Sequence, residues 1–308
     1  MKRVSIVVPV YNESENINHF VQAVREVMDS LPYAWDLLFV DDGSRDDSLE
    51  ILEKLQAECD NIKVLALSRN YGHQIALTCG LDHAQGDAVI SMDGDMQHPP
   101  TLIPELLAKW ESGCEIVQTI RQDTQGVSWL KKKTSNMYYQ LINRLSSVRI
   151  TPGGSDFRLL DRRALEAMNR YREHDRFLRG IVSLLGFNIA QVPFVAPPRF
   201  AGKSKYSLSK MMQLAVDGIV GYSVLPLRVA FMAGILLALL SICLLIHALY
   251  VYVNDEAVSG WTTIMVCMSL FCGTQLMILG IMGEYLGRIY TEVKNRPLYL
   301  LKNQEADK

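Results

Sequence analysis

The amino-acid sequence predicts an α/β domain with a mostly parallel sheet and covering helices, followed by amphipathic interface helices and two C-terminal transmembrane helices. Over the first two-thirds of the 308-residue chain, short apolar runs alternate with helix-length segments. This alternation is typical of a parallel sheet with helices on both faces. After Arg228, two long stretches contain no formally charged side chain. Each stretch is long enough to cross a bilayer.

Hydrophobic runs, and the residues that end them, place the strands and helices of the α/β domain. The pattern predicts buried strands at 4–10, 37–40, 62–67 and 88–92 and helices at 14–28, 46–58 and 73–83. We expect Ser14 to cap the first helix, and Asp46 or Asp47 to cap the second.

Three consecutive predicted strands end in polar or glycine-containing loops, at 41–44, 68–73 and 93–97. The carboxyl ends of parallel strands meet at one edge of a sheet, and open α/β sheets bind their ligands there. We therefore predict a nucleotide cleft along this edge, with plain turns as the alternative.

The loop after the fourth strand carries two carboxylates. Asp93 and Asp95 can turn to the same side of an extended chain, Gly94 keeps the backbone between them slim, and Gln97 can add a neutral oxygen. Oxygen ligands of this kind suit a hard divalent cation that carries a diphosphate. The alternative is an ordinary loop, in which Asp-x-Asp is common.

Other polar residues on the same edge have two readings each. Asp41 and Asp42 can accept hydrogen bonds from a base or ribose, or they can cap a helix, and Glu13 has the same two readings. Arg69 can neutralise a diphosphate or stack on a base, or it can be a solvated surface residue. Their value as site residues therefore depends on the whole set.

Two stretches near the C-terminus, 229–253 and 261–283, are predicted to span the membrane. The link between them, 254–260, has no Lys or Arg. Basic residues flank the other ends, at Arg228, Arg288, Lys294 and Arg296. By the positive-inside rule, the link lies outside and both termini lie in the cytoplasm. Because Met1-Lys2-Arg3 leads straight into the first strand, we expect no signal peptide.

Composition narrows the classes of partner. The formal net charge of -2 argues against a nucleic-acid-binding protein. The six cysteines form no Cys-x-x-Cys pair, so we interpret them as reduced packing residues of a cytoplasm-facing protein.

Two basic segments have the pattern of helices that lie on a membrane surface. In 129–145, apolar residues fall near one helical face with lysines around it, and 203–228 repeats the pattern. An anionic membrane surface attracts such segments. A solvated charged helix of the globular domain is the alternative.

Several motifs together resemble those of a known family. They are Val-Val-Pro-Val-Tyr-Asn-Glu at 7–13, Val-Asp-Asp-Gly-Ser at 40–44, Arg-Asn-Tyr-Gly-His at 69–73 and Met-Asp-Gly-Asp-Met-Gln-His-Pro-Pro at 92–100. In order and spacing this set resembles the family 2 glycosyltransferases, which have a Rossmann-like GT-A fold. With two spans and Gly-Glu-Tyr-Leu-Gly-Arg-Ile-Tyr at 283–290, the chain resembles the polyisoprenyl-phosphate glycosyltransferases, the group of bactoprenol glucosyltransferases and dolichol-phosphate mannose synthases.

The resemblance implies an activity. A single sugar would pass from a nucleotide-sugar donor to the phosphate of an isoprenoid lipid, with inversion and with Mg²⁺ or Mn²⁺ as cofactor. UDP-glucose as donor and undecaprenyl phosphate as acceptor are expectations from the family. A lipid phosphate has a second pKa near ~6, so it attacks as a dianion without a strong base. Basic residues that hold this phosphate then matter more than a proton acceptor.

The resemblance also implies roles for individual residues. Asp95 and Gln97, with Asp93 beside them, would hold the metal, and the base and ribose pocket would include Pro9, Tyr11, Glu13 and Asp42, with Arg69 near the diphosphate. Arg199 and Lys205 are candidates for charge stabilisation in a mobile loop near the donor phosphates. Candidates for the acceptor phosphate are Arg121, Lys131 and Arg176. Arg176 belongs to the segment 176–180, which can contribute a cation to the sugar or acceptor region or can be an exposed helix face.

Asp156 follows a Gly-Gly pair and precedes a helix that is expected to begin at Asp161. In the family an acidic residue at this position lies in the active site, where it orients the lipid phosphate or the sugar, or takes a proton. A structural turn is the alternative. The expected organisation is a cytoplasmic GT-A domain at 1–200, a mobile loop and interface helix at 201–228, a transmembrane hairpin at 229–283 and a cytoplasmic tail at 284–308.

Three rival functions remain. A processive polysaccharide synthase usually has a Gln-x-x-Arg-Trp motif, and no tryptophan here follows an arginine. A transporter or lipid-flipping protein would need the two spans to form a path in an oligomer, and no intramembrane acid marks one. A non-catalytic nucleotide-binding scaffold is the third rival. Metal-dependent turnover separates these rivals from a glycosyltransferase of the inner membrane. Two lone spans would gain packing partners in an assembly, so a homo-oligomer is a further expectation.

Overall fold

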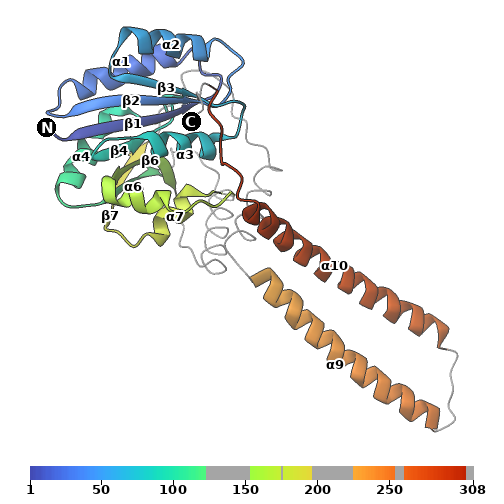
Figure 1. The fold of residues 1–308 in the computed structure, drawn as a ribbon. Helices are drawn as coiled ribbons and strands as arrows, with labels where there is room; N and C mark the ends of the chain where they lie inside the picture. The colour runs from blue at the N-terminus through green and yellow to red at the C-terminus, as the bar shows by residue number, and fades with distance from the viewer. Residues whose placement is uncertain (123–152, 175, 196–224, 254–259, 303–308) are drawn as a thin grey trace. The chain divides into compact units, whose positions relative to one another are not determined.

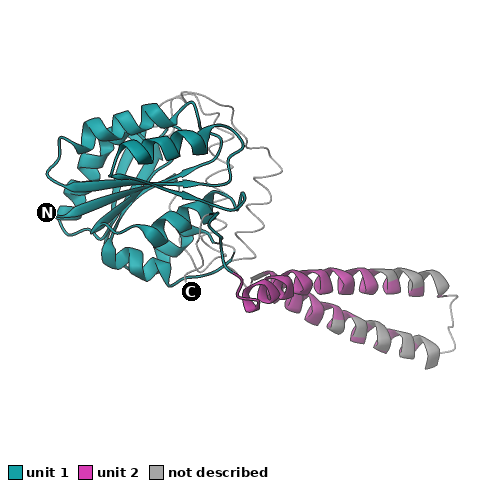
Figure 2. Cartoon of the chain, turned by 45° about the horizontal axis from the view of Figure 1, so that its top comes forward, with its two compact units in different colours: residues 1–144, 148–206, 297–308 teal, residues 145–147, 207–296 magenta. Residues whose placement is uncertain are grey.

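The structure, a computed structural model, describes residues 1–122, 153–174, 176–195, 225–253 and 260–302 (Figure 1). The chain divides into two compact units (Figure 2). The described part of the first unit comprises residues up to 195 together with 297–302, and that of the second comprises 225–296.

The first unit is built on a seven-stranded sheet with the order β3-β2-β1-β4-β6-β5-β7. The strands are β1 Arg3–Val10, β2 Ala34–Asp41, β3 Ile62–Ala66, β4 Ala88–Ser91, β5 Ile116–Gln122, β6 Gly154–Asp161 and β7 Ile189–Val195. All neighbouring strands pair in parallel except β6, which is antiparallel to both β4 and β5. The predicted α/β class with a mostly parallel sheet is confirmed.

Helices cover both faces of this sheet (Figure 1). They are α1 Ile17–Met28, α2 Ser48–Glu58, α3 His73–His83, the 3-10 helix η1 Pro100–Leu102, α4 Ile103–Glu111, α6 Arg162–Asn169 and α7 Leu178–Leu184. One hydrophobic core contains side chains of α1, α2 and α4, and a second contains those of α3, α6 and α7. The sheet therefore lies between two helical layers.

The central strand β1 explains the unbroken apolar run at the start of the sequence. Ile6 and Val8 belong to the core under α1, whereas Val7 belongs to the core under α3. Because successive side chains of a strand point to opposite faces, a strand covered on both sides must be apolar at every position.

Helix α1 begins later than the sequence predicted. Its N-cap is Asn16, not Ser14, and the Asn16 side chain donates a 2.6 Å hydrogen bond to Glu13. The helix expected to begin at Asp161 is α6, and Asp161 is its N-cap, since its carboxylate accepts a hydrogen bond from the backbone N–H of Arg163.

The segment 297–302 belongs to the first unit and adds to the edge of the sheet beside β3. Leu301 forms an antiparallel bridge with Leu67, and the backbone N–H of Ser68 donates a 2.8 Å hydrogen bond to the Leu300 carbonyl. Tyr299 and Leu301 pack on a small apolar core that includes Cys79. The segment 297–302 is thus a structural part of the α/β domain.

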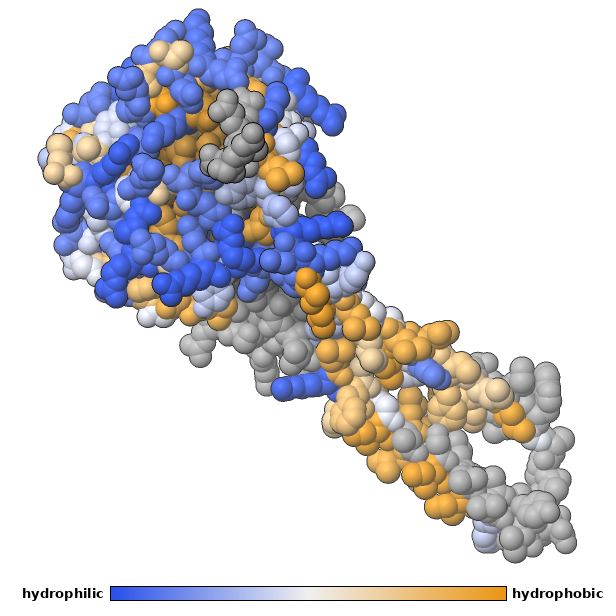
Figure 3. Space-filling model, in the orientation of Figure 1, coloured by the Kyte–Doolittle hydropathy of each residue, from blue (hydrophilic) through white to orange (hydrophobic). Residues whose placement is uncertain are grey.

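The second unit contains two long helices, α9 Leu225–Val253 and α10 Trp261–Val293. Their surface is largely apolar (Figure 3), with Leu236 69% and Leu276 70% exposed. Among the described residues, one segment, Leu270–Val293, is long and apolar enough to cross a membrane, and Pro226–Leu237 is a shorter apolar stretch. One candidate span is therefore found, and the pair of spans stays a prediction.

Candidate active site

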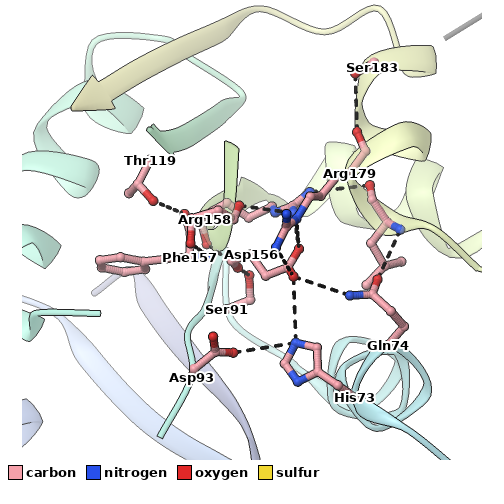
Figure 4. A network of polar contacts seen from close by, with 12 residues as sticks. His73, Gln74, Ser91, Asp93, Thr119, Asp156, Phe157, Arg158, Arg179 and Ser183 are labelled. Carbon is pink, nitrogen blue, oxygen red and sulfur yellow. Dashed lines mark hydrogen bonds and ion pairs between the residues drawn. The ribbon is translucent and has the colours of Figure 1, made fainter. Parts of the chain in front are cut away.

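The candidate site forms where β4 ends and β6 begins. Ser91, the last residue of β4, pairs with Arg158 of β6. Because β6 runs in the opposite direction, the chain beyond Ser91 and the chain before Arg158 reach the same edge of the sheet. This register brings Asp93 and Asp156 to one place, although they come from distant parts of the sequence (Figure 4).

His98 closes the loop that carries Asp93. Its Nδ1 accepts a 2.8 Å hydrogen bond from the backbone N–H of Asp93, so a neutral ring carries its proton on Nε2. Nε2 then donates a 2.8 Å hydrogen bond to the hydroxyl of Ser155, and the ring stacks on Phe157 with centroids 5.2 Å apart. His98 thereby fixes the aspartate loop against β6.

The middle of this loop has an uncommon backbone. Met96 lies in the left-handed region with a φ of 62°, and such a conformation is strained for a residue with a side chain. The turn is closed by the backbone N–H of Gln97, which donates a 3.1 Å hydrogen bond to Asp95. Asp93, Asp95 and Gln97 are all partly exposed residues at the sheet edge.

The oxygens of this loop suit a divalent cation only if a substrate and water supply its remaining ligands. Its two carboxylates and one amide are oxygen ligands, as Mg²⁺ or Mn²⁺ prefers. The described residues contain no group of three or more His, Cys, Asp or Glu side chains that could hold a metal. Since Mg²⁺ usually takes one or two carboxylates and completes its shell with substrate phosphates and water, the donor set suits a cation that arrives with a diphosphate.

Asp156 lies in a bulge of β6. Gln118 pairs with Arg158 and Ile120 with Gly154, so Thr119 alone faces three residues of β6. The hydroxyl of Thr119 donates a 2.7 Å hydrogen bond to the carbonyl of Phe157 and holds the bulge in place. Bulges re-aim side chains near functional sites, and this one presents Asp156 beside the aspartate loop.

The carboxylate of Asp156 is the centre of a polar network. One oxygen accepts from Arg158 at 2.6 Å and from Nε of Arg179 at 3.0 Å, and the other accepts from Nη2 of Arg179 at 2.9 Å and from Gln74 at 3.3 Å. The Asp156 side chain is only 7% exposed. A buried carboxylate with this many donors is held in one orientation.

His73 links this network to the aspartate loop (Figure 4). Its Nε2 lies 3.6 Å from Asp93 and 3.8 Å from Asp156. Burial lowers the pKa of His73, but the nearby carboxylates of Asp156 and Asp93 outweigh it, so the pKa is raised. The imidazole therefore bridges the two carboxylates.

Charge also determines the protonation state of Asp156. Burial raises the pKa of this carboxyl, but Arg179, His73 and Arg158 together hold it well below the ordinary value. Asp156 is thus ionised at neutral pH. Arg158, which is 2% exposed, compensates this charge inside the protein.

The position of His73 depends on Asp42. The two carboxylate oxygens of Asp42 accept hydrogen bonds from the backbone N–H groups of Tyr71, at 2.7 Å, and Gly72, at 2.9 Å. Burial raises the pKa of Asp42, and these two hydrogen bonds oppose the rise. Gly43, with a φ of 68°, lets the two loops touch, because a Cβ there would lie 2.7 Å from the backbone of Arg69. Asp42 therefore holds the loop that precedes α3, and its predicted contact with a nucleotide stays a prediction.

The other residues expected from the sequence have diverse surroundings. Pro9 is buried in β1, Tyr11 is half-buried, and Glu13 holds Asn16 at the start of α1. The guanidinium of Arg69 lies 4.6 Å from the ring centre of Tyr71. Their nucleotide-binding role remains a prediction.

Two of the predicted acceptor residues can be located. Arg121 is exposed near the end of β5, on the edge where β4 also ends. Arg176 is buried and donates to the carbonyl of Met168 at 3.4 Å. Lys131, Arg199 and Lys205, with the predicted interface segments 129–145 and 203–224, lie outside the described residues.

No individual role was expected for four residues of this network, namely His73, Gln74, His98 and Arg158. His73 could have been found, because it ends the motif Arg-Asn-Tyr-Gly-His. Arg179 lies in the segment 176–180 that was expected to contribute a cation, but Arg176 was the residue chosen from it. The contacts to Asp156 single out Arg179.

Residues 5–168 match the protein-family model of glycosyl transferase family 2. This chain belongs to glycosyl transferase family 2. Members of this family are glycosyltransferases, so the resemblance found in the sequence is confirmed.

Relatives match this glycosyltransferase over nearly its whole length. The uncharacterized glycosyltransferase YkcC of Bacillus subtilis is 43% identical over 97% of this chain and 93% of its own. The bactoprenol glucosyl transferase of Shigella phage SfV is 38% identical over 98% of this chain and 99% of its own.

A solved structure, glucosyl-3-phosphoglycerate synthase from Mycobacterium tuberculosis in complex with Mn²⁺, UDP and glucosyl-3-phosphoglycerate, has a TM-score of 0.47. It is 17% identical and covers 71% of this glycosyltransferase and 78% of its own chain. At this level of similarity, nothing about the present site follows from that complex.

Proposed function

We propose that this protein transfers a single hexose, glucose first among the candidates, from a UDP-sugar to undecaprenyl phosphate, with inversion at the anomeric carbon. The observation that carries the proposal is that His73 lies between Asp93 and Asp156, and that Asp156 in turn binds Arg179. A carboxylate suited to a metal and a cation suited to a phosphate are linked there through two residues.

The donor belongs on the loop of Asp93, Asp95 and Gln97, which would hold Mg²⁺ or Mn²⁺. The metal supplies charge compensation for the departing nucleoside diphosphate, which a hexose donor must release. Pro9, Tyr11, Glu13, Asp42 and Arg69 are the proposed nucleotide pocket. His98 keeps the loop in place through the backbone of Asp93.

The acceptor is a phosphate and needs no strong base. With a second pKa near ~6 it is largely dianionic at neutral pH. Arg121, Lys131 and Arg176 are the proposed cations for the acceptor, and Arg199 and Lys205 are proposed to stabilise charge near the donor phosphates.

The membrane setting is part of the proposal. The helices α9 and α10 would form a two-span hairpin of the inner membrane, with both termini and the catalytic unit in the cytoplasm. Undecaprenyl phosphate is a membrane lipid, so a membrane hairpin in the same chain would keep enzyme and acceptor together. The interface segments 129–145 and 203–228 would lie on the bilayer, and the hairpin would gain packing partners in a homo-oligomer.

Relatives named bactoprenol glucosyl transferase support glucose and the lipid acceptor, because they match at 38% identity over nearly the whole chain. The identity of the sugar depends on pocket shape, so a donor panel is the direct test.

The purified full chain, in detergent with Mg²⁺ and undecaprenyl phosphate, is given a panel of nucleotide sugars. Nucleoside diphosphate release and the lipid product are measured for the wild type and for Asp95→Ala. We expect release that requires the lipid with one donor and a loss of at least about 100-fold in the variant. No turnover with any donor, together with intact nucleotide binding, would reject the transferase and favour a scaffold.

A further inference from the structure

We propose that Arg179 binds the phosphate group of the acceptor and that Asp156 orients this arginine instead of removing a proton. The inference rests on the proposed function in one respect, namely that the acceptor is a phosphomonoester. It assigns the acceptor phosphate to Arg179, whereas the residue chosen from the segment 176–180 in the sequence was Arg176.

The geometry of the Arg179–Asp156 pair is bidentate. Nε and Nη2 of Arg179 bind different oxygens of Asp156, at 3.0 and 2.9 Å. This arrangement fixes the plane of the guanidinium as well as its position. A pre-oriented guanidinium matches a phosphate with little loss of side-chain freedom.

Exposure separates the two arginines bound to Asp156. The Arg158 side chain is 2% exposed and that of Arg179 is 37% exposed. Arg158 therefore compensates the charge of Asp156 inside the protein, while Arg179 can contact a ligand that enters from solvent. Beside it, His73 is 43% exposed and presents a second nitrogen-bearing ring to the same region.

The charge of Arg179 suits an anion. Arg158 and Arg179 both contact Asp156, and Arg179 is the more exposed of the two. A guanidinium at this position would complement a phosphate dianion.

Asp156 is poorly placed to act as a base. Its two oxygens accept four hydrogen bonds, three of them from arginines, and its side chain is 7% exposed, so a proton could reach it only by displacing one of these donors. The low pKa of Asp156, set by Arg179, His73 and Arg158 against the effect of burial, points the same way. An acceptor phosphate that is already ionised does not require this proton transfer.

The acceptor, and not the donor, is the phosphate that this position favours. Figure 4 shows Asp93 and Arg179 on different sides of Asp156, with His73 near Asp93. The proposed metal and donor diphosphate belong on the Asp93 side. A phosphate on Arg179 would then face the donor across the site, which is the arrangement that displacement with inversion requires.

The test measures binding of undecaprenyl phosphate and of undecaprenol to the full chain in detergent, together with binding of UDP in the presence of Mg²⁺. The variants are Arg179→Gln, Arg179→Lys, Asp156→Asn and Arg179→Gln/Asp156→Asn. Arg163→Gln is the control, because Arg163 is 78% exposed and pairs with Glu115 away from the site.

We expect Arg179→Gln to weaken undecaprenyl phosphate binding by at least about 10-fold, the range of one charge-assisted hydrogen-bonded pair. Undecaprenol and UDP binding should change by less than about two-fold, as should all ligands in Arg163→Gln. Arg179→Lys should recover part of the lost affinity. Asp156→Asn should add little to Arg179→Gln, because two residues that act as one unit are not additive.

Several results would overturn the inference. Unchanged lipid phosphate affinity in Arg179→Gln excludes Arg179 as the ligand, and weaker UDP binding in its place assigns Arg179 to the donor. A further fall of at least about 100-fold in kcat at saturating acceptor, when Asp156→Asn is added to Arg179→Gln, gives Asp156 a chemical role of its own. If Asp156→Asn does not fold, the Arg179→Gln and Arg179→Lys pair decides the phosphate assignment.

The outcome also separates this inference from the proposed function. Binding of undecaprenyl phosphate that depends on Arg179, without sugar transfer from any donor, would reject the transferase and retain the phosphate site. Sugar transfer by Arg179→Gln with normal acceptor affinity would retain the transferase and reject the phosphate site at Arg179.

Discussion

The hydroxyl of Tyr299 donates a 2.9 Å hydrogen bond to Asp82, although 217 positions separate the two residues. Asp82 also accepts from Arg172 at 2.7 and 2.9 Å. Burial raises the pKa of Tyr299, so this phenol stays protonated and donates over the whole physiological range. The C-terminal segment is thereby attached to α3, the helix that begins with His73.

Tyr299→Phe removes this hydrogen bond and leaves Asp82 paired with Arg172. We expect a loss of about 1 to 2 kcal/mol in unfolding free energy, since one buried partner is lost. Thermal unfolding in detergent measures it. Tyr33→Phe is the control, because the Tyr33 hydroxyl bonds Glu111 at an exposed position, where changes are within about 0.5 kcal/mol. Equal losses in both variants would contradict a structural role for the C-terminal segment.

Asp42→Asn tests whether Asp42 primarily holds a loop. An amide offers one acceptor oxygen, so its NH₂ group would face the N–H of Tyr71 or Gly72. We expect a loss of about 2 to 3 kcal/mol in stability, together with weaker UDP binding. Urea unfolding and UDP titration measure the two effects. Asp47→Asn, at an exposed position, is the control. Weaker UDP binding at full stability would show that Asp42 contacts the nucleotide only.

Acid should destabilise the site through Asp156. Its pKa is lowered in the folded protein, so its stabilising effect is present above the ordinary value of 3.8 and is lost as pH falls below it. Asp42 has the opposite effect on stability: because its pKa is raised in the folded protein, its protonation at low pH favours the folded state. The stability difference between the wild type and Asp156→Asn isolates the first effect. It should shrink between about pH 5 and pH 3, and a constant difference would show that the charge of Asp156 does not stabilise the fold.

The proposed two-span topology predicts that the link between α9 and α10 is accessible from outside the cytoplasm. A Ser259→Cys variant should react with a membrane-impermeant maleimide in intact cells, above the wild-type background. Lys54→Cys, on the exposed side of α2, should react only after permeabilisation. Labelling of both in intact cells, or of neither, would contradict the two-span arrangement.

Local sequence was enough to predict the parallel strands β1 to β4 and the aspartate loop, but β5, β6 and β7 were not predicted. Hydrophobic runs such as the one through Val7 have no helical period, and Asp93 follows its strand directly, so both features depend on neighbouring residues alone. The binding partners of Asp93 were not predictable in this way. They depend on the register between Ser91 and Arg158 and on a bulge opposite Thr119, which pairing between distant segments determines.

The choice between Arg176 and Arg179 illustrates the same limit. Both arginines lie in one short segment, and composition gives no reason to prefer either. The start of α7 at Leu178 directs Arg179 to Asp156, while Arg176 precedes the helix and meets the carbonyl of Met168. Helix boundaries are set by tertiary packing as well as by propensity, so a shift of two residues decides which side chain reaches the site.

The most direct test of the central claim is the molar ratio between UDP released and hexosyl lipid formed, measured by mass spectrometry with UDP-glucose and undecaprenyl phosphate. The account predicts one UDP for each lipid that carries a single hexose on its phosphate, and no release when undecaprenol replaces the phosphate. UDP release without lipid, or products with several hexoses, would contradict it.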